Sequence, residues 1–179
     1  MKKKLFFAGA GGQGALAIGQ MIAKAAMDEG LEVTWLPSYG PEMRGGTANC
    51  TVVVSDRPIS CPLINDADVL VVMNLPSLTK FQSMVVPGGT LFINSSLVPE
   101  TSNRDDIKVI EVPANEKASE LGNERASNIV MLSAILKETG IVKEETVRHE
   151  IEKTFSSRKA KFLPANLAAL KSYLVRDCK

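Results

Sequence analysis

The chain has 179 residues, a length typical of one domain, and 45% of them are hydrophobic while 23% are charged. This composition excludes a disordered chain, and we expect a single domain over residues 1–179. Because 21 Lys and Arg residues stand against 20 Asp and Glu residues, the net charge of +1 excludes a global field that recruits nucleic acid or an anionic membrane. Any anion that binds must be held by a local site.

The first third of the chain predicts three strands and one helix. Leu5–Ala8 is a short apolar run that ends in glycine, and apolar residues then recur at helical spacing over Leu16–Ala26. Leu31–Leu36 and Ala48–Ser55 have the pattern of strands, and the Gly- and Pro-rich stretch 37–46 separates them. Because no helix lies between these two strands, we expect them to pair antiparallel and to form an additional layer.

The rest of the chain alternates strands with helices. Strands are predicted at Asp68–Met73, Thr90–Asn94 and Lys108–Val112, and helices at Ser77–Met84, Asn115–Leu121, Ser127–Thr139, Glu144–Phe155 and Leu167–Val175. Ser127 or Asn128 is expected to cap the fourth helix of the chain, and Gly140 to end it. The alternation predicts a Rossmann-like α/β fold with a largely parallel central sheet.

The cysteines and the start of the chain bear on where the protein works. Cys50, Cys61 and Cys178 lie far apart without CxxC spacing, so they do not supply a four-thiolate cluster, and we interpret them as free thiols of a reducing cytosol. Met1–Ala8 resembles the start of a secretory signal, but glycines interrupt the apolar segment that would follow. The longest other aliphatic run, Val69–Met73, is far below the ~20 residues that span a bilayer, so we expect a cytoplasmic protein.

A glycine-rich loop is the first candidate site. Its candidate binding residues are Gly9, Gly11, Gly12, Gln13 and Gly14, which fit GxGxxG between a predicted strand and a predicted helix. Glycines let a backbone approach a ligand closely, and the unpaired amides of a helix start attract a phosphate or carboxylate. The alternative is a turn whose glycines only allow the helix to pack close to the sheet.

The end of the second predicted strand argues against a dinucleotide cofactor. An NAD site places Asp or Glu there to bind the ribose hydroxyls, whereas this strand ends in Trp35-Leu36-Pro37-Ser38. Glu32 comes at the start of the strand, away from the carboxyl edge of the sheet. An NAD-dependent dehydrogenase is therefore disfavoured.

A second, less generic loop follows that strand with the sequence SYGPEMRGG. It brings an aromatic, an anion and a cation together between turn-forming glycines, and we expect it at the same carboxyl edge as the glycine loop. Its cation either binds a phosphate or carboxylate or pairs within the loop or with a neighbouring subunit. The candidate binding residues of this loop are Ser38, Tyr39, Glu42, Arg44, Gly45 and Gly46.

With these two motifs, GAGGQG at Gly9–Gly14 and SYGPEMRGG at Ser38–Gly46, the chain resembles the gamma subunit of the 2-oxoacid:ferredoxin oxidoreductases. Asp68-Val69-Leu70 and Pro87-Gly88-Gly89 extend the resemblance over nearly the whole chain. Within the family, the sequence is most similar to members that act on 2-oxoglutarate or branched-chain 2-oxoacids, with 2-oxoglutarate as the expected substrate.

The resemblance implies one subunit of a heteromeric enzyme that is inactive alone and contributes no catalytic residue or metal site. Such complexes oxidatively decarboxylate a 2-oxoacid to an acyl-coenzyme A and reduce ferredoxin, with thiamine diphosphate, Mg²⁺ and iron–sulfur clusters bound by partner chains. It implies that this chain serves assembly and coenzyme A binding. Gly11, Gly12, Gln13 and Gly14 would present backbone donors to a phosphate of coenzyme A or to a partner's carboxylate, Arg44 would add charge, and Tyr39 would shape the entrance. The alternative is a free-standing Rossmann-like nucleotide-binding or regulatory module.

Overall fold

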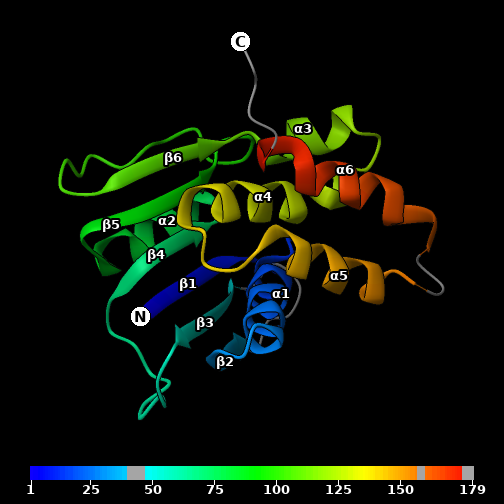
Figure 1. Cartoon of the computed structure of the whole chain (residues 1–179). Helices are drawn as coiled ribbons and strands as arrows, with labels where there is room; N and C mark the ends of the chain where they lie inside the picture. The colour runs from blue at the N-terminus through cyan, green and yellow to red at the C-terminus, as the bar shows by residue number, and fades with distance from the viewer. Residues whose placement is uncertain (40–46, 157–159, 175–179) are drawn as a thin grey trace.

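The computed structural model describes residues 1–39, 47–156 and 160–174, and within these ranges the chain forms a six-stranded sheet flanked by helices (Figure 1). The strands lie in the spatial order β2-β3-β1-β4-β5-β6. Their bounds are Lys2–Ala10 for β1, Glu32–Tyr39 for β2, Thr47–Ser55 for β3, Ala67–Val72 for β4, Val85–Asn94 for β5 and Lys108–Val112 for β6.

The sheet has a parallel part and an antiparallel part. β1, β4, β5 and β6 run parallel to one another, which confirms the predicted largely parallel Rossmann-like sheet. β3 runs antiparallel to both β1 and β2, so the predicted antiparallel pairing is present. The pair forms the antiparallel side of the central sheet, because each residue of β1 from Lys2 to Ala10 lies opposite a residue of β3.

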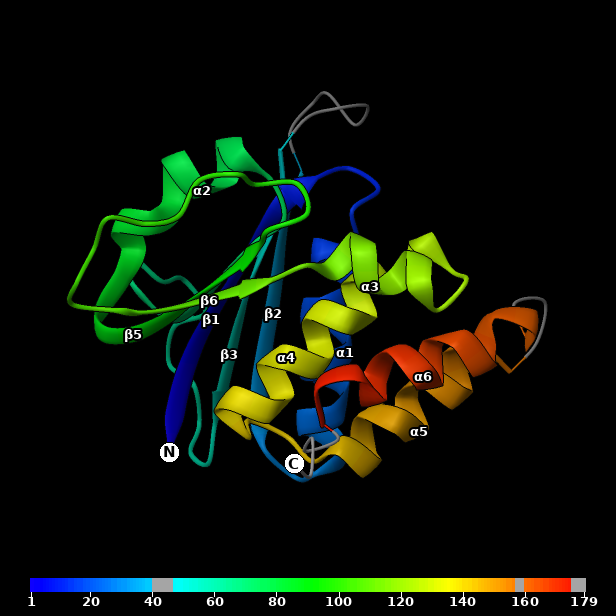
Figure 2. The same cartoon turned by 90° about the horizontal axis from the view of Figure 1, so that it is seen from above.

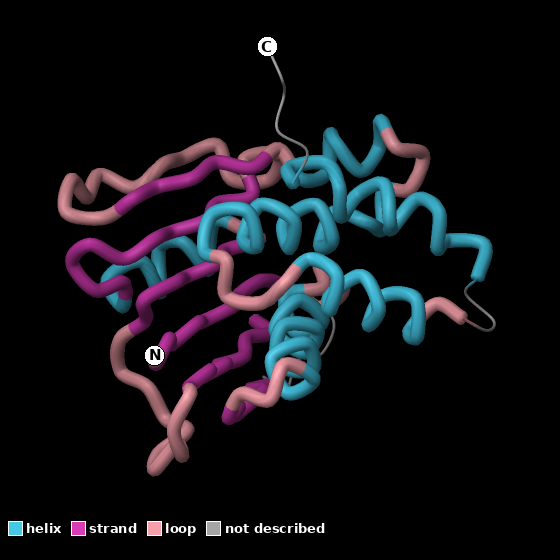
Figure 3. Tube along the Cα trace, in the orientation of Figure 1, coloured by secondary structure: helices cyan, strands magenta, loops and turns pink. Residues whose placement is uncertain are grey.

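Helices cover both faces of the sheet unequally. α1, α4, α5 and α6 lie on one face and the short α2 lies on the other, as the view from above shows (Figure 2). In the tube drawing the strands form one continuous layer beside the larger group of helices (Figure 3). The helix bounds are Ala15–Asp28 for α1, Leu75–Phe81 for α2, Ala114–Glu120 for α3, Ser127–Thr139 for α4, Glu144–Thr154 for α5 and Leu163–Leu174 for α6; the 3-10 turns are η1 Gln82–Met84, η2 Glu124–Ala126 and η3 Ala160–Phe162.

The ends of α4 agree with the prediction, whereas the starts of β5 and α6 differ from it. α4 begins and ends at the predicted residues, and Gly140 closes it in the left-handed conformation with φ +55°. β5 starts earlier than predicted, at Val85, because the strand continues through the Pro-Gly-Gly stretch and pairs with β4 across a register shift. α6 starts at Leu163, earlier than the predicted Leu167, because Pro164 fits the first turn of a helix.

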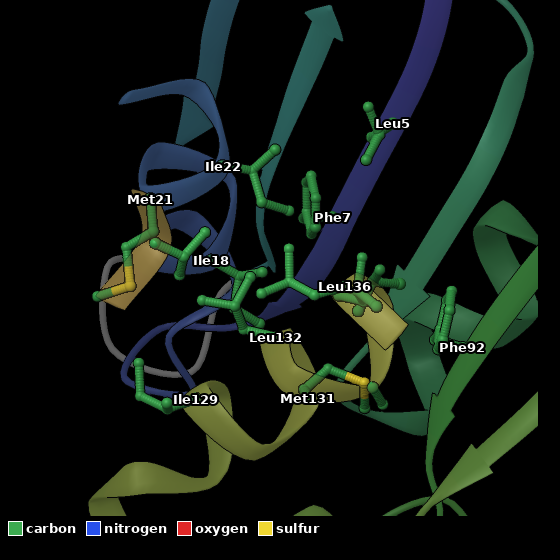
Figure 4. Packing of buried hydrophobic residues seen from close by; sticks show 14 of the residues in the cluster. Leu5, Phe7, Ile18, Met21, Ile22, Phe92, Ile129, Met131, Leu132 and Leu136 are labelled. Atoms are coloured by element: carbon green, nitrogen blue, oxygen red, sulfur yellow. The ribbon is translucent and has the colours of Figure 1, made fainter. Parts of the chain in front are cut away.

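The core consists of two layers divided by the sheet. Leu5 and Phe7 of β1 point to the α1 and α4 face, whereas Phe6 and Ala8 point to the α2 face. Figure 4 shows Phe7 close to residues of α1 and α4 such as Ile22 and Leu132. Each large side chain that is fully buried contributes about 1.5–3 kcal/mol to folding. This packing fixes α1 and α4 on one side of β1 and thereby sets the surroundings of the loop between β1 and α1.

Across the described parts of the chain, no helix combines the length and the apolar character needed to cross a membrane.

Candidate functional site

The glycine loop lies at the carboxyl edge of the parallel strands, between the end of β1 at Ala10 and the start of α1 at Ala15. The residues that flank 40–46 are attached at the same edge, because Thr47 lies opposite Ala10 and Ala48 lies opposite Tyr39. Ser38 is exposed in the last part of β2. Thus the end of β2 and the start of β3 lie at the same edge as the glycine loop. Four further candidates, Glu42, Arg44, Gly45 and Gly46, lie outside the described residues.

Hydrogen bonds within the glycine loop fix its shape. The backbone N–H of Gln13 donates to the carbonyl oxygen of Ala10 at 3.2 Å, and the N–H of Ala10 donates to the Gln13 side-chain Oε1 at 2.7 Å. Gln13 therefore uses its own backbone donor inside the turn, which corrects the expectation that it offers this donor to a ligand. No described residue accepts a hydrogen bond from the backbone N–H of Gly11, Gly12 or Gly14.

Close packing explains two of the glycines but not a third. A Cβ on Gly9 would lie 2.9 Å from both Gln13 Oε1 and Met73 Cβ. Gly14 has φ +81°, and a Cβ there would lie 2.8 Å from the side chain of Asn128 on α4. Gly12 is exposed, with φ +93° and no heavy atom within 4 Å of an added Cβ. The loop thus joins α1 closely to α4 and leaves its tip open to solvent.

The helix starts near this edge are satisfied in different ways. The Asn74 side chain accepts from Ser77 N–H at 3.0 Å and caps α2. Ser96 Oγ accepts from the N–H groups of Asn115 and Glu116 at 3.2 and 3.3 Å, and so serves the start of α3. α1 and α4 have no side-chain cap, and the 3-10 turn η2 leads directly into the start of α4.

The predicted cap of α4 is wrong. Its N-cap is Ala126, and Ser127 and Asn128 are its first helical residues. The side chain of Asn128 reaches Gly14 instead of folding back onto its own helix. As a result the uncapped starts of α1 and α4 lie side by side, where their dipoles favour an anion.

A pocket of about 410 Å³ opens between the glycine loop and the start of α4. Its walls include Gly12, Gly14, Asn115, Arg125 and Asn128. Arg125 is exposed, and within the described residues it takes part in no ion pair. A guanidinium beside two uncapped helix starts is suited to a phosphate or carboxylate.

Arg125 was missed by the sequence reasoning. It is preceded by Asn123 and Glu124 in a short polar stretch and carries no motif, although its position two residues before an apolar helix is a weak signal of a helix start. Its approach to the glycine loop depends on the packing of α4 against α1, which sequence spacing does not express.

The cysteines have other surroundings. Cys50 is buried, burial raises the pKa of its thiol to about 12, and a Cβ on Gly19 would lie 2.6 Å from its sulfur. Cys50 is thus a packing residue between β3 and α1. Cys61 is exposed, and Cys178 lies outside the described residues. Within the described ranges no three His, Cys, Asp or Glu side chains gather in a way that would hold a metal ion.

Comparison with known proteins gives a consistent result. The family model described as pyruvate ferredoxin/flavodoxin oxidoreductase matches residues 4–173. The chain is 41% identical over 167 residues to the ketoisovalerate oxidoreductase subunit VorA of Methanothermobacter marburgensis, covering 92% of this chain and 34% of VorA. It therefore spans about a third of the length of that relative.

Two further similarities extend along most of both chains. The 2-oxoglutarate synthase subunit KorC of the same organism is 34% identical over 162 residues, covering 84% of this chain and 87% of KorC. The crystal structure of the gamma subunit of a keto/oxoacid ferredoxin oxidoreductase from Geobacter sulfurreducens superposes with a TM-score of 0.82 at 28% identity, covering 96% of this chain and 93% of that one.

Proposed function

This chain belongs to the pyruvate ferredoxin/flavodoxin oxidoreductase family and matches its gamma subunits, and on that premise we propose that it is one subunit of a heteromeric 2-oxoacid:ferredoxin oxidoreductase. The assembled enzyme converts a 2-oxoacid and coenzyme A to an acyl-coenzyme A and carbon dioxide, and passes two electrons to ferredoxin. The role of this chain is to bind coenzyme A at the carboxyl edge of its sheet and to dock there against partner subunits.

One observation carries the coenzyme A proposal. At one edge of the sheet, the side chains of Asn74 and Ser96 accept hydrogen bonds from the first amides of α2 and α3, whereas the neighbouring starts of α1 and α4 have no side-chain cap. Those two starts meet at the 410 Å³ pocket beside Arg125. A phosphate supplies the missing acceptors and is attracted by both helix dipoles and the guanidinium.

In this proposal, residues of the glycine loop and of the second loop have different roles in binding coenzyme A. The N–H groups of Gly11, Gly12 and Gly14 donate to phosphate oxygens, while Gln13 holds the turn in shape. The second loop, whose two ends are attached beside the glycine loop, contributes the Arg44 charge, and Tyr39 borders the entrance. With the phosphate fixed, the pantetheine arm is free to carry its thiol to an active site on a partner chain.

The proposal assigns the remaining cofactors, thiamine diphosphate with Mg²⁺ and the iron–sulfur clusters, to partner chains. It is supported by the cysteine spacing, which does not supply a four-thiolate cluster. The conversion of the 2-oxoacid is assigned to the same partner chains. These are a thiamine-diphosphate-binding subunit and an iron–sulfur subunit.

The decisive experiment replaces the cation of the second loop. In the reconstituted complex, Arg44→Ala raises the KM for coenzyme A about tenfold, since a charge-assisted hydrogen bond to phosphate is lost, and leaves the thiamine diphosphate content unchanged. Arg57→Ala is the matched control, because Arg57 is exposed and follows β3 at the opposite edge of the sheet. Unchanged coenzyme A kinetics in a fully assembled Arg44→Ala complex would refute the role of this loop.

The substrate is proposed to be 2-oxoglutarate, with a branched-chain 2-oxoacid as the second candidate. The first follows the sequence resemblance and the similarity to KorC along most of both chains, and the second is favoured by the higher identity to VorA. Comparing kcat/KM of the purified complex for 2-oxoglutarate, ketoisovalerate and pyruvate decides between them. A free-standing module predicts instead that the tagged chain purifies without thiamine-diphosphate-binding or cluster-bearing partners.

A further inference from the structure

The segment that joins β3 to β4 lies at the edge of the sheet opposite the glycine loop. Figure 3 shows it as a loop that projects beyond the ends of the strands. We call its residues Pro58–Asn65 the arm. Within the described chain, no backbone group of the arm forms a hydrogen bond with another backbone group. The arm is therefore not held together by turns of its own.

The arm is uncharged and exposes apolar surface. None of its residues is Asp, Glu, Lys or Arg. Leu63 is 70% exposed, more than any other large hydrophobic side chain among the described residues. Pro58, Cys61 and Pro62 are exposed as well, and the two prolines restrict the backbone at their positions. An exposed apolar segment of this kind is typical of a contact with another protein.

Both ends of the arm are fixed beside the start of β1. The backbone N–H of Asp56 donates to the carbonyl oxygen of Met1 at 3.0 Å, and the carboxylate of Asp66 pairs with Lys4. Near the second end, Ile64 packs against the core on the α2 face. The arm is thus presented in a defined position, so a protein that binds it loses little conformational entropy.

The size of the arm decides between a second copy of this chain and a different subunit. A stable interface uses about 20–30 residues on each side. The arm offers eight residues, so two arms that pack on each other are too small to hold a dimer together. A subunit that the assembly already holds in place needs only a small additional contact, because the second binding event is then intramolecular.

We propose that the arm inserts Leu63 into an uncharged, apolar groove of a partner subunit of the same complex. The inference rests on the proposed heteromeric enzyme and adds a second contact surface to the carboxyl edge of the sheet. Because the arm and the glycine loop lie at opposite edges, this contact does not involve the coenzyme A site.

Cys61 reports directly on the contact, because it is exposed on the arm whereas Cys50 is buried. In a Cys178→Ser background, a maleimide probe labels Cys61 in the separately purified chain. Assembly with the partner subunits lowers the labelling rate about tenfold or more, since a buried thiol is inert. Met27→Cys combined with Cys61→Ser is the matched control, because Met27 is 64% exposed at the end of α1 and lies outside the arm. Its labelling rate stays the same on assembly.

Substitution of Leu63 tests how much the contact contributes to assembly. Leu63→Asp raises the Kd for the partner subunits about tenfold or more, the effect expected when one buried leucine is lost from an interface. Leu63→Ala gives a smaller loss in the same direction. Because the side chain is exposed in the free chain, the urea midpoint of the isolated subunit stays unchanged. Met27→Asp is the control and leaves the Kd unchanged.

The outcomes separate this inference from the function on which it rests. If the complex assembles while Leu63→Asp leaves the Kd unchanged or Cys61 stays reactive, the arm contact is refuted and the proposed function stands. A chain that purifies without any partner subunit overturns the proposed function and this inference with it. Labelling of Cys61 that slows as the concentration of the chain alone is raised assigns the arm to a second copy and also overturns the proposal.

Discussion

Four helices begin near the carboxyl edge of this sheet, and they form two contrasting pairs. α2 and α3 are seven residues long, and the acceptors Asn74 and Ser96 satisfy their first amides. α1 and α4 are 14 and 13 residues long, they pack against each other through Gly14 and Asn128, and their starts lack such acceptors among the described residues. The first pair has side-chain acceptors for some of its first amides, whereas the second pair has none and, in the proposed function, donates to a molecule from outside.

The two pairs differ in capping although they begin at the same edge of the sheet, so the lack of a side-chain cap is specific to α1 and α4. The lack of an N-cap lowers the free energy of unfolding by about 1 kcal/mol. Both long helices tolerate this loss because their stability comes from packing against a large core. At the opposite edge of the sheet, charged groups have partners within the chain. There Met1, Lys4, Arg104 and Lys108 pair with acids of the same chain.

The largest expected effect on stability is at the contact between the two uncapped helices. Gly14→Ala lowers the free energy of unfolding by about 2–4 kcal/mol, because the left-handed conformation is costly for alanine and the new Cβ overlaps Asn128. Urea denaturation measures the loss. Gly12→Ala, with a similar φ but open space around it, loses only the conformational part of about 1–2 kcal/mol. Equal losses in the two variants would show that the contact with α4 is unimportant.

A smaller effect is expected at a capped helix. Asn74→Ala removes the acceptor of the Ser77 N–H and lowers the free energy of unfolding by about 1 kcal/mol. Because this cap serves only α2, the KM for coenzyme A in the complex stays unchanged. A rise in that KM would contradict the proposal that only the uncapped helix starts bind coenzyme A.

The acidic groups of the opposite edge give a still smaller, pH-dependent effect. Hydrogen bonds from the Met1 amine, Lys4 and Arg104 lower the pKa values of Asp56, Asp66 and Asp106 respectively. A carboxyl whose pKa is lower in the folded state stabilises the fold above its unfolded pKa, and this contribution disappears as the pH falls through the folded pKa. Stability therefore declines below the ordinary aspartate pKa of 3.8.

Urea unfolding at a series of acidic pH values measures this decline. Asp66→Asn reduces the slope because one of the three carboxyls no longer titrates, and high salt weakens the effect because these pairs are exposed. A slope identical to that of the wild type would show that the Lys4 pair is absent in solution.

The smallest effect on the free energy of unfolding is expected at Arg125, where the effect on coenzyme A binding is large. Arg125→Gln changes the free energy of unfolding by less than about 0.5 kcal/mol, because the side chain is exposed and forms no ion pair with a described residue. It raises the KM for coenzyme A several-fold in the assembled complex. Arg148→Gln on α5, where the cation pairs with Glu152 away from the pocket, is the control.

Local signals in the sequence predicted most elements of the fold. An apolar stripe and Gly140 predicted α4 to the residue, and glycine spacing predicted the loop after β1. The sequence does not predict the start of β5, because Pro87-Gly88-Gly89 is typical of a break, whereas the strand continues through it. The pairing of β3 with β1 was not predicted either, since a hairpin pattern does not specify which outer strand it joins.

The site was less predictable than the fold. Gln13 was identified, but its side chain closes the turn by a hydrogen bond that spacing alone does not reveal. Arg125 belongs to a segment that no motif links to the glycine loop. It lies beside that loop because α4 packs on the same face of the sheet as α1, and this packing depends on many small side-chain contacts.

The internal closure of the glycine loop by Gln13 has an energetic consequence. A loop that must become ordered when its ligand arrives loses conformational entropy, and the affinity is reduced by that amount. Here two hydrogen bonds within the chain itself form the Ala10–Gln13 turn. We therefore expect binding at this loop to cost little backbone conformational entropy over Ala10–Gln13.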